Sequence, residues 1–391
     1  MIKYIEDLNI EDKKVIIRCD FNVPIENGKI IDDTRIKEAL KTINYCLDKN
    51  CSIILMSHLG RIKMEEDKEK NSLRPVAERL SKLLNKEVIF IDETHGKKLE
   101  KACKDLKNGE ILLMENTRFE DLDNKKESNC DDSLSKYWAS LGDIFIDDAF
   151  GCSHRMAASN VGITKYLESG LGFLMQKEIN TLSELNDAKK PFIIILGGKK
   201  VSDKIGVIKK LVTKADYILV GGGMAFTFLK AEGFDVGASI VDNKSIDFCK
   251  GIIEKYGDKI MLPVDIVVSN EFKNTGNYEI KDITALDFND IGMDIGPRTV
   301  KNFEKIIKKS KTLFWNGPLG VYEFSYFRKS TEDILNYIIN NNVKAILGGG
   351  DIVACASSLN LKDKVYYAST GGGASLEFLE GKKLPALTKK R

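Results

Sequence analysis

The sequence holds few histidines, tryptophans and prolines, with three His, two Trp and seven Pro in 391 residues. No two cysteines have the C-x-x-C spacing and no histidine cluster accompanies them, which argues against a zinc site. No apolar run approaches the ~18 residues that a membrane-spanning helix requires. The rest is an ordinary globular composition, 43% hydrophobic and 30% charged, with enough apolar material for two cores.

The eight cysteines indicate a reducing compartment. Several lie in apolar runs, where a free thiol behaves as a small hydrophobic group, and a disulfide framework is not expected in a chain of this size. The first stretch, Met1 to Asp7, contains no long apolar segment of the kind found in secretory signals. We therefore expect a cytoplasmic protein without disulfides.

Arginine is scarce and unevenly placed. The 60 Lys and Arg residues nearly balance 58 Asp and Glu residues, and a net charge of +2 argues against a protein built mainly to hold nucleic acid or a membrane surface. Of those 60 residues only 10 are Arg, and seven of the 10 lie at or before Arg155. Because Arg suits fork-shaped recognition of phosphate and carboxylate, the first half is a candidate anion site. An accidental distribution is the alternative.

Short apolar runs alternate with amphipathic stretches along the chain. Helical spacing covers residues 34–48, 76–84 and 133–141. The apolar runs do not alternate with polar residues, which is typical of parallel strands covered on both faces. Such runs predict strands at 15–17, 53–56, 88–91, 111–114, 144–146, 192–196, 217–220, 259–262, 312–315, 345–347 and 364–367.

This alternation predicts an α/β fold of two doubly wound, Rossmann-like domains with parallel central sheets. At ~150 residues per domain the length favours two domains, and a single (β/α)8 barrel has too few units for so many strands. A Gly-flanked helical stretch at 171–187 precedes a new strand and marks the seam. We expect an N-terminal domain over 1–170 and a C-terminal domain over 171–373, joined by an interdomain helix and hinge.

Ligands of open parallel sheets bind at the carboxyl ends of the strands. In the first half these ends carry four Arg, two His, one Asp and one Asn that could converge on one cleft, with Arg35 opening the first helix. Arg could hold a small multiply charged anion such as a phosphorylated acid, and Asp20 and Asn22 could hold its hydroxyl groups. Surface salt bridges and helix caps are the alternative. The candidate residues are Asp20, Phe21, Asn22, Arg35, His58, Leu59, Gly60, Arg61, Arg118 and Arg155.

In the second half the strands end in glycine-rich turns, at residues 197–198, 221–223, 317–320, 348–350 and 371–373. Glycine lets backbone N–H groups approach a ligand, and a helix N-terminus just beyond favours phosphate. One such turn is weak evidence, but five in one domain predict a nucleotide or polyphosphate site. The Walker pattern, a G-x-G-x-x-G after the first strand of either half, and the H-R-D and D-F-G pair of protein kinases are missing.

A series of motifs resembles phosphoglycerate kinases over essentially the whole chain. They are, in order, KVIIRCDFNVP, DDTRI, SHLGR, ENTRF, DDAFGCSHR, LGGKKVSDKI, GGGMAFTF, DIGPRT, WNGPLGVYE, GGGD and STGGGASLE. The resemblance implies a monomeric glycolytic hinge enzyme that transfers a phosphoryl group between 1,3-bisphosphoglycerate and ADP, giving 3-phosphoglycerate and ATP, with Mg²⁺. It also implies that residues 374–391 pack back on the first domain.

By motif match, the candidate residues of the first half would hold 3-phosphoglycerate. The nucleotide would meet Lys200, Lys204, Gly222, Gly292, Asn316, Glu323, Gly349, Gly350, Asp351 and Ile352, and Asp351 would reach the metal. Arg35, Lys204, Gly350 and Gly372 would carry the chemistry. The acceptor is a carboxylate, ionised at neutral pH, so no general base is needed. The residues have to position the reactants and neutralise phosphoryl charge.

Three departures from the family pattern leave the central residues in place. Lys199 stands where Ala is usual, Met156-Ala157 where a second His is often near, and Ile352 where Ser or Thr is usual. Two other hypotheses are a catalytically weak scaffold that keeps the fold and a different small-molecule kinase. Retention of the Gly clusters and catalytic residues argues against the scaffold, and the Arg set with Asp20 and Asn22 argues against the other kinase.

The remaining conspicuous residues are predicted to be structural. We expect His95 at the surface without a partner, and Trp138 and Trp315 in packing. Lys382, Lys383 and residues 389–391 read as a solvated tail. Arg18, Arg74 and Arg79 are left without a functional role.

Overall fold

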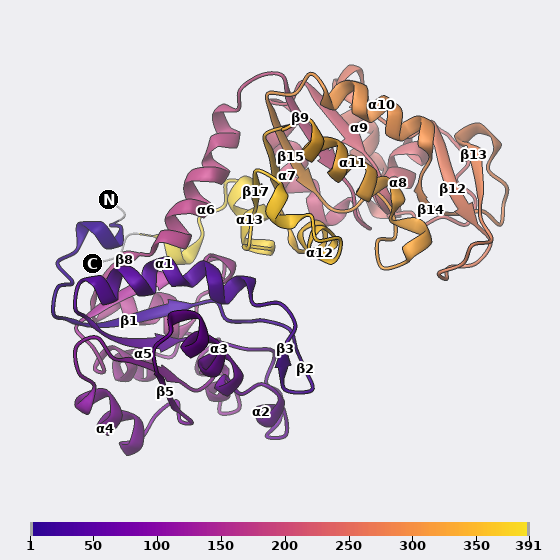
Figure 1. The fold of residues 1–391 in the computed structure, drawn as a ribbon. Coiled ribbons are helices and arrows are strands. Elements are labelled where there is room, and N and C mark those ends of the chain that lie inside the picture. Colours follow the sequence, from indigo (N-terminus) through magenta and orange to yellow (C-terminus); the bar gives the residue numbers. More distant parts are fainter. Residues whose placement is uncertain (1–2, 389–391) are drawn as a thin grey trace. The chain divides into compact units, whose positions relative to one another are not determined.

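A computed structural model describes residues 3–388 of the chain (Figure 1). The chain divides into two compact units, the first formed by Met1–Asn180 with Lys383–Arg391 and the second by Thr181–Lys382. The first change of unit falls inside helix α6 (Phe173–Ser183), and the second follows helix α13 (Gly373–Leu379). Both changes lie later in the chain than the predicted boundaries at residues 170 and 373.

Local contacts explain where the chain changes unit. The backbone N–H groups of Leu174 and Met175, in the first turn of α6, donate to Asp148 Oδ1 at 2.9 and 3.1 Å and keep the start of α6 with the first unit. Helix α13 packs on helix α7 (Ile205–Leu211), so residues 374–382 stay with the second unit.

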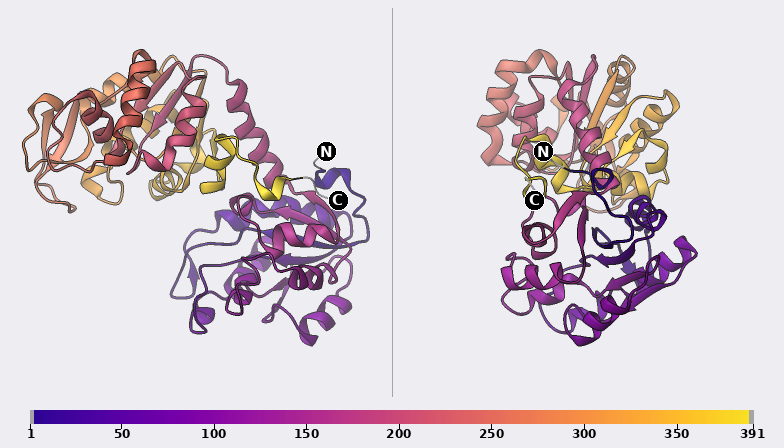
Figure 2. Two further views of the ribbon diagram at one scale, coloured as in Figure 1. Left: turned by 180° about the vertical axis from the view of Figure 1, so that it is seen from behind. Right: turned by 90° about the vertical axis from the view of Figure 1, so that its left-hand side faces the viewer.

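After residue 382 the described chain returns to the first unit. The short 3-10 turn Pro385–Leu387 packs there, and Ala386 N donates to Ser153 O at 3.1 Å. Figure 2 shows this yellow segment beside the first unit. Lys382, predicted as solvated tail, pairs with Glu380 at 2.7 Å. Residues 389–391 of that predicted tail lie outside the described range.

The first unit contains a six-stranded parallel sheet in the order β5-β6-β4-β1-β7-β8. Its strands are β1 (Lys14–Cys19), β4 (Ser52–Met56), β5 (Val88–Ile91), β6 (Ile111–Met114), β7 (Ile144–Asp148) and β8 (Glu168–Leu171). Its other helices are α1 (Thr34–Asp48), α2 (Asp67–Lys70), α3 (Arg74–Leu84), α4 (Lys97–Asp105) and α5 (Asp132–Ala139). Strands β2 (Ile25–Glu26) and β3 (Lys29–Ile30) form a small antiparallel pair.

Strand β1 shows how this sheet is covered on both faces. Val15 and Ile17 belong to the core that includes residues of α1 and α3, whereas Ile16 belongs to the core formed with α4 and α5. Successive strand residues point to opposite faces, so both faces must be apolar when both are packed by helices. The strand therefore reads as an uninterrupted apolar run.

The second unit repeats this plan with a parallel sheet in the order β11-β10-β9-β15-β16-β17. The strands are β9 (Phe192–Leu196), β10 (Tyr217–Val220), β11 (Ile260–Met261), β15 (Thr312–Asn316), β16 (Ala345–Leu347) and β17 (Tyr367–Ala368). Its remaining helices are α8 (Gly222–Glu232), α9 (Ile246–Tyr256), α10 (Pro297–Ile307), α11 (Lys329–Asn340) and α12 (Gly350–Ser358).

The predicted fold class is confirmed, since each unit has a parallel sheet and intervening helices. Three features of the strands were not predicted, the first of which is the antiparallel pair formed by β2 and β3. Strand β8 was missed because its sequence Glu-Ser-Gly-Leu has little apolar character. The second unit also holds an antiparallel sheet in the order β13-β12-β14, made of β12 (Asp265–Ser269), β13 (Glu279–Asp282) and β14 (Ile291–Ile295). Residues 362–364 form a 3-10 turn, so β17 begins later than predicted.

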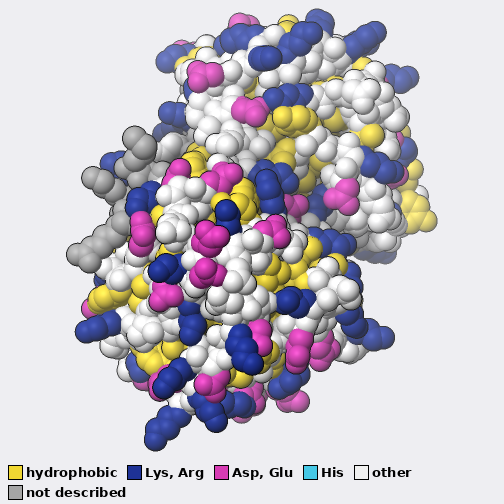
Figure 3. Space-filling view, turned by 60° about the vertical axis from the view of Figure 1, so that its left-hand side comes forward, with side chains coloured by type: hydrophobic (Ala, Val, Ile, Leu, Met, Phe, Trp, Pro, Cys, Tyr) yellow, Lys and Arg dark blue, Asp and Glu magenta, His cyan; other side chains and the backbone are white. Residues whose placement is uncertain are grey.

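On the face shown in Figure 3, Lys and Arg lie among Asp and Glu rather than in one basic stripe. None of the helices between residues 3 and 388 combines the length and apolar character that a bilayer crossing requires.

Substitution of Phe145 on β7 tests the packing of the core in the first unit. Phe145 is fully buried in the same cluster as Trp138, and Phe145→Ala should lower the free energy of unfolding of this unit by about 3–5 kcal/mol through the cavity it leaves. Urea denaturation followed by Trp138 fluorescence in a Trp315→Phe background measures this, because Trp315 lies in the other unit. Met64→Ala is the control, since Met64 lies in the same unit and is 57% exposed, so this substitution should change little. Equal effects would contradict the assigned core.

Candidate active site

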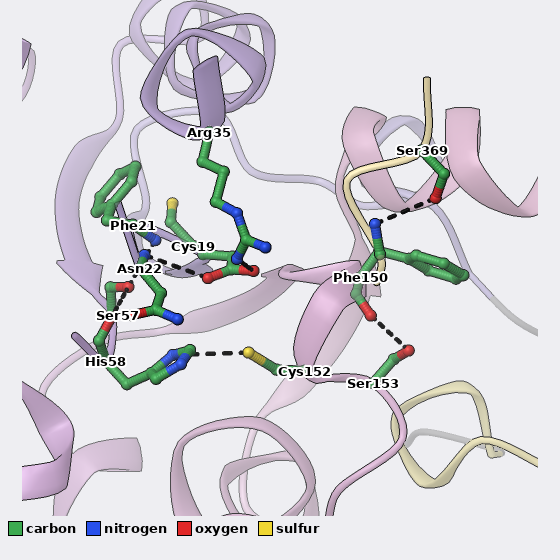
Figure 4. A network of polar contacts seen from close by, with 12 residues as sticks. Cys19, Phe21, Asn22, Arg35, Ser57, His58, Phe150, Cys152, Ser153 and Ser369 are labelled. Atoms are coloured by element: carbon green, nitrogen blue, oxygen red, sulfur yellow. Dashed lines mark hydrogen bonds and ion pairs between the residues drawn. The ribbon is translucent and has the colours of Figure 1, made fainter. Parts of the chain in front are cut away.

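Four strand ends of the first unit bring polar side chains together. Asp20 and Asn22 follow β1, His58 follows β4 and Arg118 lies beyond β6, while Arg35 reaches in from the first turn of α1. Figure 4 shows Arg35 extending from its helix toward the strand ends and the His58 ring facing Cys152, which follows β7. Adjacent parallel strands end at the same edge of the sheet, which is why residues far apart in sequence meet here.

Asp20 is the buried anion of this cluster. It is 6% exposed and forms an ion pair with Arg35. Burial alone would raise the pKa of Asp20, but the nearby Arg35, His58 and Arg18 hold it below its usual value. The same pairing raises the pKa of Arg35. The carboxylate is thus ionised and the guanidinium is held over the site.

The backbone after β4 is fixed by neighbouring side chains. Gly60 N donates to Asn22 Oδ1 at 2.8 Å, and Arg118 donates to Gly60 O. Asn116 clamps the preceding residue, accepting from Leu59 N at 3.1 Å and donating to Leu59 O at 2.7 Å. Phe21 N donates to Ser57 Oγ at 2.8 Å. Phe21, Leu59 and Gly60 therefore shape the site through their backbone.

Two predicted cationic residues, Arg61 and Arg155, are exposed. Arg155 Nε donates to the adjacent His154 Nε2 at 3.0 Å. Neither side chain joins the buried cluster, so their predicted role at the anion site stays a prediction.

The second unit contains a cavity of about 520 Å³. Four of the predicted nucleotide residues line it, namely Gly222, Gly292, Glu323 and Asp351, together with Lys199. Much of the remaining wall is apolar, including Phe226 and Ile240. A largely apolar recess with a few polar groups at hand is typical of sites for planar organic ligands.

Glycine is required where this cavity is walled by backbone. Gly222 has φ +62°, and an added Cβ would lie 2.6 Å from Gly198 N and 2.8 Å from Pro318 O. Gly292 N donates to Ser239 Oγ at 2.9 Å, and a Cβ there would come 1.9 Å from the Phe226 ring.

Lys204 lies beside these turns, 9% exposed. Its ammonium donates to Asn316 Oδ1, and the Asn316 amide in turn donates to Gly348 O. Burial lowers the pKa of Lys204 to about 8, although Asp351 and Asp203 favour the charged form. The residue is a buried cation whose hydrogen-bond partner is an uncharged amide.

Two helices of the second unit, α12 and α13, begin at glycines that were predicted to take part in the site. Gly349 caps α12 with φ +97°, Gly350 is the first residue of that helix, and Gly372 caps α13 with φ +53°. Ile352 has its side chain fully buried in the core, so only its backbone can take part in a site, and Lys200 is exposed.

Two residues of the site walls were not among the predicted site residues. Asn116 and Asp294 are buried, and both lie in recognised motifs, ENTRF and DIGPRT, which was the available signal. Asp294 lines the cavity and accepts from Ser330 N at 3.0 Å, while burial raises its pKa to about 7.

The outcome for the residues predicted as structural is mixed. Trp138 and Trp315 are fully buried as predicted. His95 is exposed, but the prediction that it has no partner was wrong, because its Nδ1 lies 2.5 Å from Glu120 Oε1. Arg74 stacks 4.7 Å from the centre of the Phe90 ring, and Arg79 pairs with Asp33 at 2.6 Å. Both contacts are structural.

Comparison with known proteins agrees with this geometry. Residues 5–382 match the family described as phosphoglycerate kinase. The chain belongs to the phosphoglycerate kinase family. Phosphoglycerate kinases of Fusobacterium nucleatum and Listeria monocytogenes are each 54% identical, over 99% and 98% of this chain and 98% of their own lengths. The predicted resemblance and the phosphotransferase class are confirmed.

Solved structures of the phosphoglycerate kinase family have the same fold. The enzyme from Coxiella burnetii is 38% identical with a TM-score of 0.86, and that from Pyrococcus horikoshii is 31% identical with a TM-score of 0.84. In both cases 99% of this chain and 98% of the solved chain are covered.

Gly222 gives a direct test of the backbone wall. Gly222→Ala should destabilise the second unit by about 1–3 kcal/mol, because the new Cβ meets backbone atoms at a positive φ. Gly251→Ala in helix α9 is the matched control. Its Cβ meets nothing within 4 Å, so it should stabilise by about 0.5–1 kcal/mol. Urea denaturation followed by Trp315 fluorescence in a Trp138→Phe background measures both, and the same sign for the two variants would contradict the wall.

Proposed function

We propose that this chain is an active phosphoglycerate kinase. It would transfer a phosphoryl group reversibly between the carboxyl phosphate of 1,3-bisphosphoglycerate and ADP, in glycolysis or gluconeogenesis. The observation that supports this most is the complementary pair of half-sites, a cationic cluster around Asp20 in one unit and a glycine-walled cavity beside Lys204 in the other. We assign 3-phosphoglycerate to the first unit and the nucleotide to the second.

The phosphorylated acid is proposed to bind through charge and shape. Arg35, Arg61, Arg118 and Arg155 supply guanidinium groups for its phosphate and carboxylate, because a planar fork matches such oxygens. Asp20 and Asn22 hold the hydroxyl group, and His58 contributes a further polar contact. Phe21, Leu59 and Gly60 set the wall with their backbone. The exposure of Arg61 and Arg155 leaves them able to move onto the ligand.

The nucleotide is proposed to bind with its base in the 520 Å³ cavity, against Gly222 and Gly292. Glu323 offers a carboxylate to the ribose hydroxyl groups. Lys200, Lys204 and Asn316 lie on the phosphate side, with the helix start at Gly349, Gly350 and Ile352 supplying backbone N–H groups.

Asp351 fits the magnesium ion that the family implies. Its exposed carboxylate lines the nucleotide cavity, and carboxylate oxygen is a ligand that Mg²⁺ prefers. When bound there, the ion would neutralise charge on the nucleotide phosphates. The Asp20, His58 and Cys152 group fits Mg²⁺ poorly, because it offers sulfur and nitrogen amid arginines.

Transfer needs little covalent chemistry from the protein. As the terminal oxygen of ADP bonds to phosphorus, the bond from phosphorus to the carboxyl oxygen breaks, and the departing carboxylate needs no proton. Arg35 and Lys204 neutralise charge on the transferring oxygens, helped by backbone N–H groups at Gly350 and Gly372. Because the half-sites lie on separate units, we propose that the units close on the reactants, which also excludes water.

The substrates are small molecules, and we propose a monomeric cytoplasmic enzyme that requires neither nucleic acid nor a membrane. A scaffold that has lost activity is not favoured, since the family match covers the chain and Arg35, Lys204 and Asp351 are retained.

A coupled assay tests the function. Protein supplied with ATP, 3-phosphoglycerate and Mg²⁺ should consume ATP only when 3-phosphoglycerate is present, with turnover followed by reduction of the 1,3-bisphosphoglycerate product. Folded protein that shows no turnover would contradict the proposal.

Lys204 should act mainly in the transition state. Lys204→Ala is expected to lower kcat by about 10²- to 10³-fold, with a smaller change in KM. Lys209→Ala, an exposed lysine in α7, is the control and should leave kcat unchanged.

Since the pKa of Lys204 is about 8, kcat/KM of the natural enzyme should fall as pH rises through that value and the amine loses its charge. Lys204→Arg stays charged and should lose that decline; an unchanged decline would contradict this role.

A further inference from the structure

Arg18 is a buried arginine that the proposed function does not use. It is the fifth residue of strand β1 and is 2% exposed. Its Nε donates to Ser159 Oγ at 2.8 Å, and one terminal nitrogen donates to Cys19 O. Ser159 in turn donates to Glu127 Oε1 at 2.5 Å, and Glu127 is itself 3% exposed. Two sides of the guanidinium are thereby fixed and its charge is balanced.

The remaining nitrogen, NH2, faces His58. It lies 3.2 Å from His58 Nδ1 and 3.8 Å from Cys152 Sγ. A guanidinium has hydrogen atoms to donate and no lone pair to accept with, so His58 Nδ1 must be the acceptor in this contact. Nδ1 therefore carries no proton.

Cys152 agrees with that assignment. Its Sγ lies 3.6 Å from the same Nδ1. Burial raises the pKa of the Cys152 thiol to about 12, so at neutral pH it also carries a hydrogen atom to donate. Among residues 3–388, the polar contacts of the His58 ring with Arg18 and Cys152 both fall on Nδ1, which leaves Nε2 for a ligand.

We propose that Arg18 is a positioning residue that fixes His58 as the neutral Nε2–H tautomer, so that the ring donates a hydrogen bond from Nε2 to an anionic oxygen of the bound acid. Only the identity of that acid rests on the proposed function. The tautomer itself follows from contacts within the first unit.

This arrangement suits an anion site that is already strongly cationic. Burial has the largest effect and holds the pKa of His58 well below its usual value. Arg18, Arg118 and Arg35 also disfavour a charge on the ring, whereas Asp20 favours one. A neutral N–H group donates a directed hydrogen bond, and the protein avoids the cost of burying another cation. The opposite tautomer would turn the Nε2 lone pair toward the anion and repel it.

Metal binding is an alternative role for this group of side chains, because ligand atoms of Asp20, His58 and Cys152 lie within 4.8 Å of one another. Binding it would require a thiolate at Cys152 and would displace the Arg18 contact from Nδ1. The positive charges of Arg18, Arg35 and Arg118 oppose the binding of a metal cation. The structure therefore favours the hydrogen-bonded arrangement.

The scarcity of histidine makes the tautomer measurable. The chain has three His, so ¹⁵N-histidine labelling gives three ring spectra, and His95→Gln and His154→Gln assign the third to His58. We expect the free protein at neutral pH to show His58 protonated at Nε2 alone. An Nδ1–H ring or an imidazolium would overturn the proposal, and this measurement requires neither substrate nor turnover.

Variants identify which group sets the tautomer. Cys152→Ala should leave the Nε2–H form in place, because Arg18 still donates; a changed tautomer in this variant would overturn the proposal. Arg18→Met should shift His58 toward the Nδ1–H form or raise the pH at which it protonates. Arg74→Met, which removes an arginine that stacks on Phe90 in the same unit, should change neither.

Kinetics then separates positioning from folding. In Arg18→Met that keeps its native circular dichroism, KM for 3-phosphoglycerate should rise about tenfold or more, with kcat affected less. An unchanged KM together with an unchanged His58 spectrum would overturn the proposal. If the natural protein shows the Nε2–H ring but never turns over 3-phosphoglycerate, the proposed function fails and the tautomer assignment stands.

Discussion

A buried carboxylate is the constraint on which the first unit depends. Removing Asp20 from water is costly unless cations lie beside it, and the fold supplies Arg35 from the helix after β1 and Arg18 from β1 itself. Arg18, one of those cations, then needs Ser159 and Glu127 as its own partners. Each buried charge holds the next one in place. The result is a site whose donors are oriented before any ligand arrives.

The cavity of the second unit depends on glycine residues, which have no side chain. Around this cavity, Gly222 and Gly292 stand where a Cβ would collide with backbone or with an aromatic ring. The backbone then forms the wall, and recognition falls to N–H groups and a few polar side chains. The buried cation of this unit, Lys204, is held by an amide rather than a carboxylate. Burial lowers the pKa of the Lys204 ammonium to about 8, so it loses its proton more readily than an exposed lysine does.

Much of this could be predicted from the sequence. Apolar runs located the parallel strands closely, and the strand ends predicted that Asp20, His58 and Arg118 lie at one edge of the sheet, where the parallel topology places them. Their binding roles stay a prediction. Strand β8 was missed because it contains Ser169 and Gly170 and lacks an apolar pattern. Exposure could not be predicted either, since the same arginine signal covered the buried cluster and the exposed Arg61 and Arg155. The role of Arg18 depends on which ring nitrogen it reaches, and no sequence pattern encodes that distance.

The end of strand β7 positions two parts of the first unit, the start of helix α6 and the loop that holds Cys152. Asp148, the last residue of β7, accepts from the N–H groups of Leu174 and Met175 in the first turn of α6. Gly172 allows this close approach, because a Cβ there would lie 2.3 Å from the carboxylate oxygen. Four residues after Asp148 comes Cys152, beside His58. Helix α6, in which the chain leaves this unit, and the loop that borders the anion site are therefore both anchored at the end of β7. The position of Asp148 therefore sets both where α6 begins and where the loop beside His58 leaves the sheet.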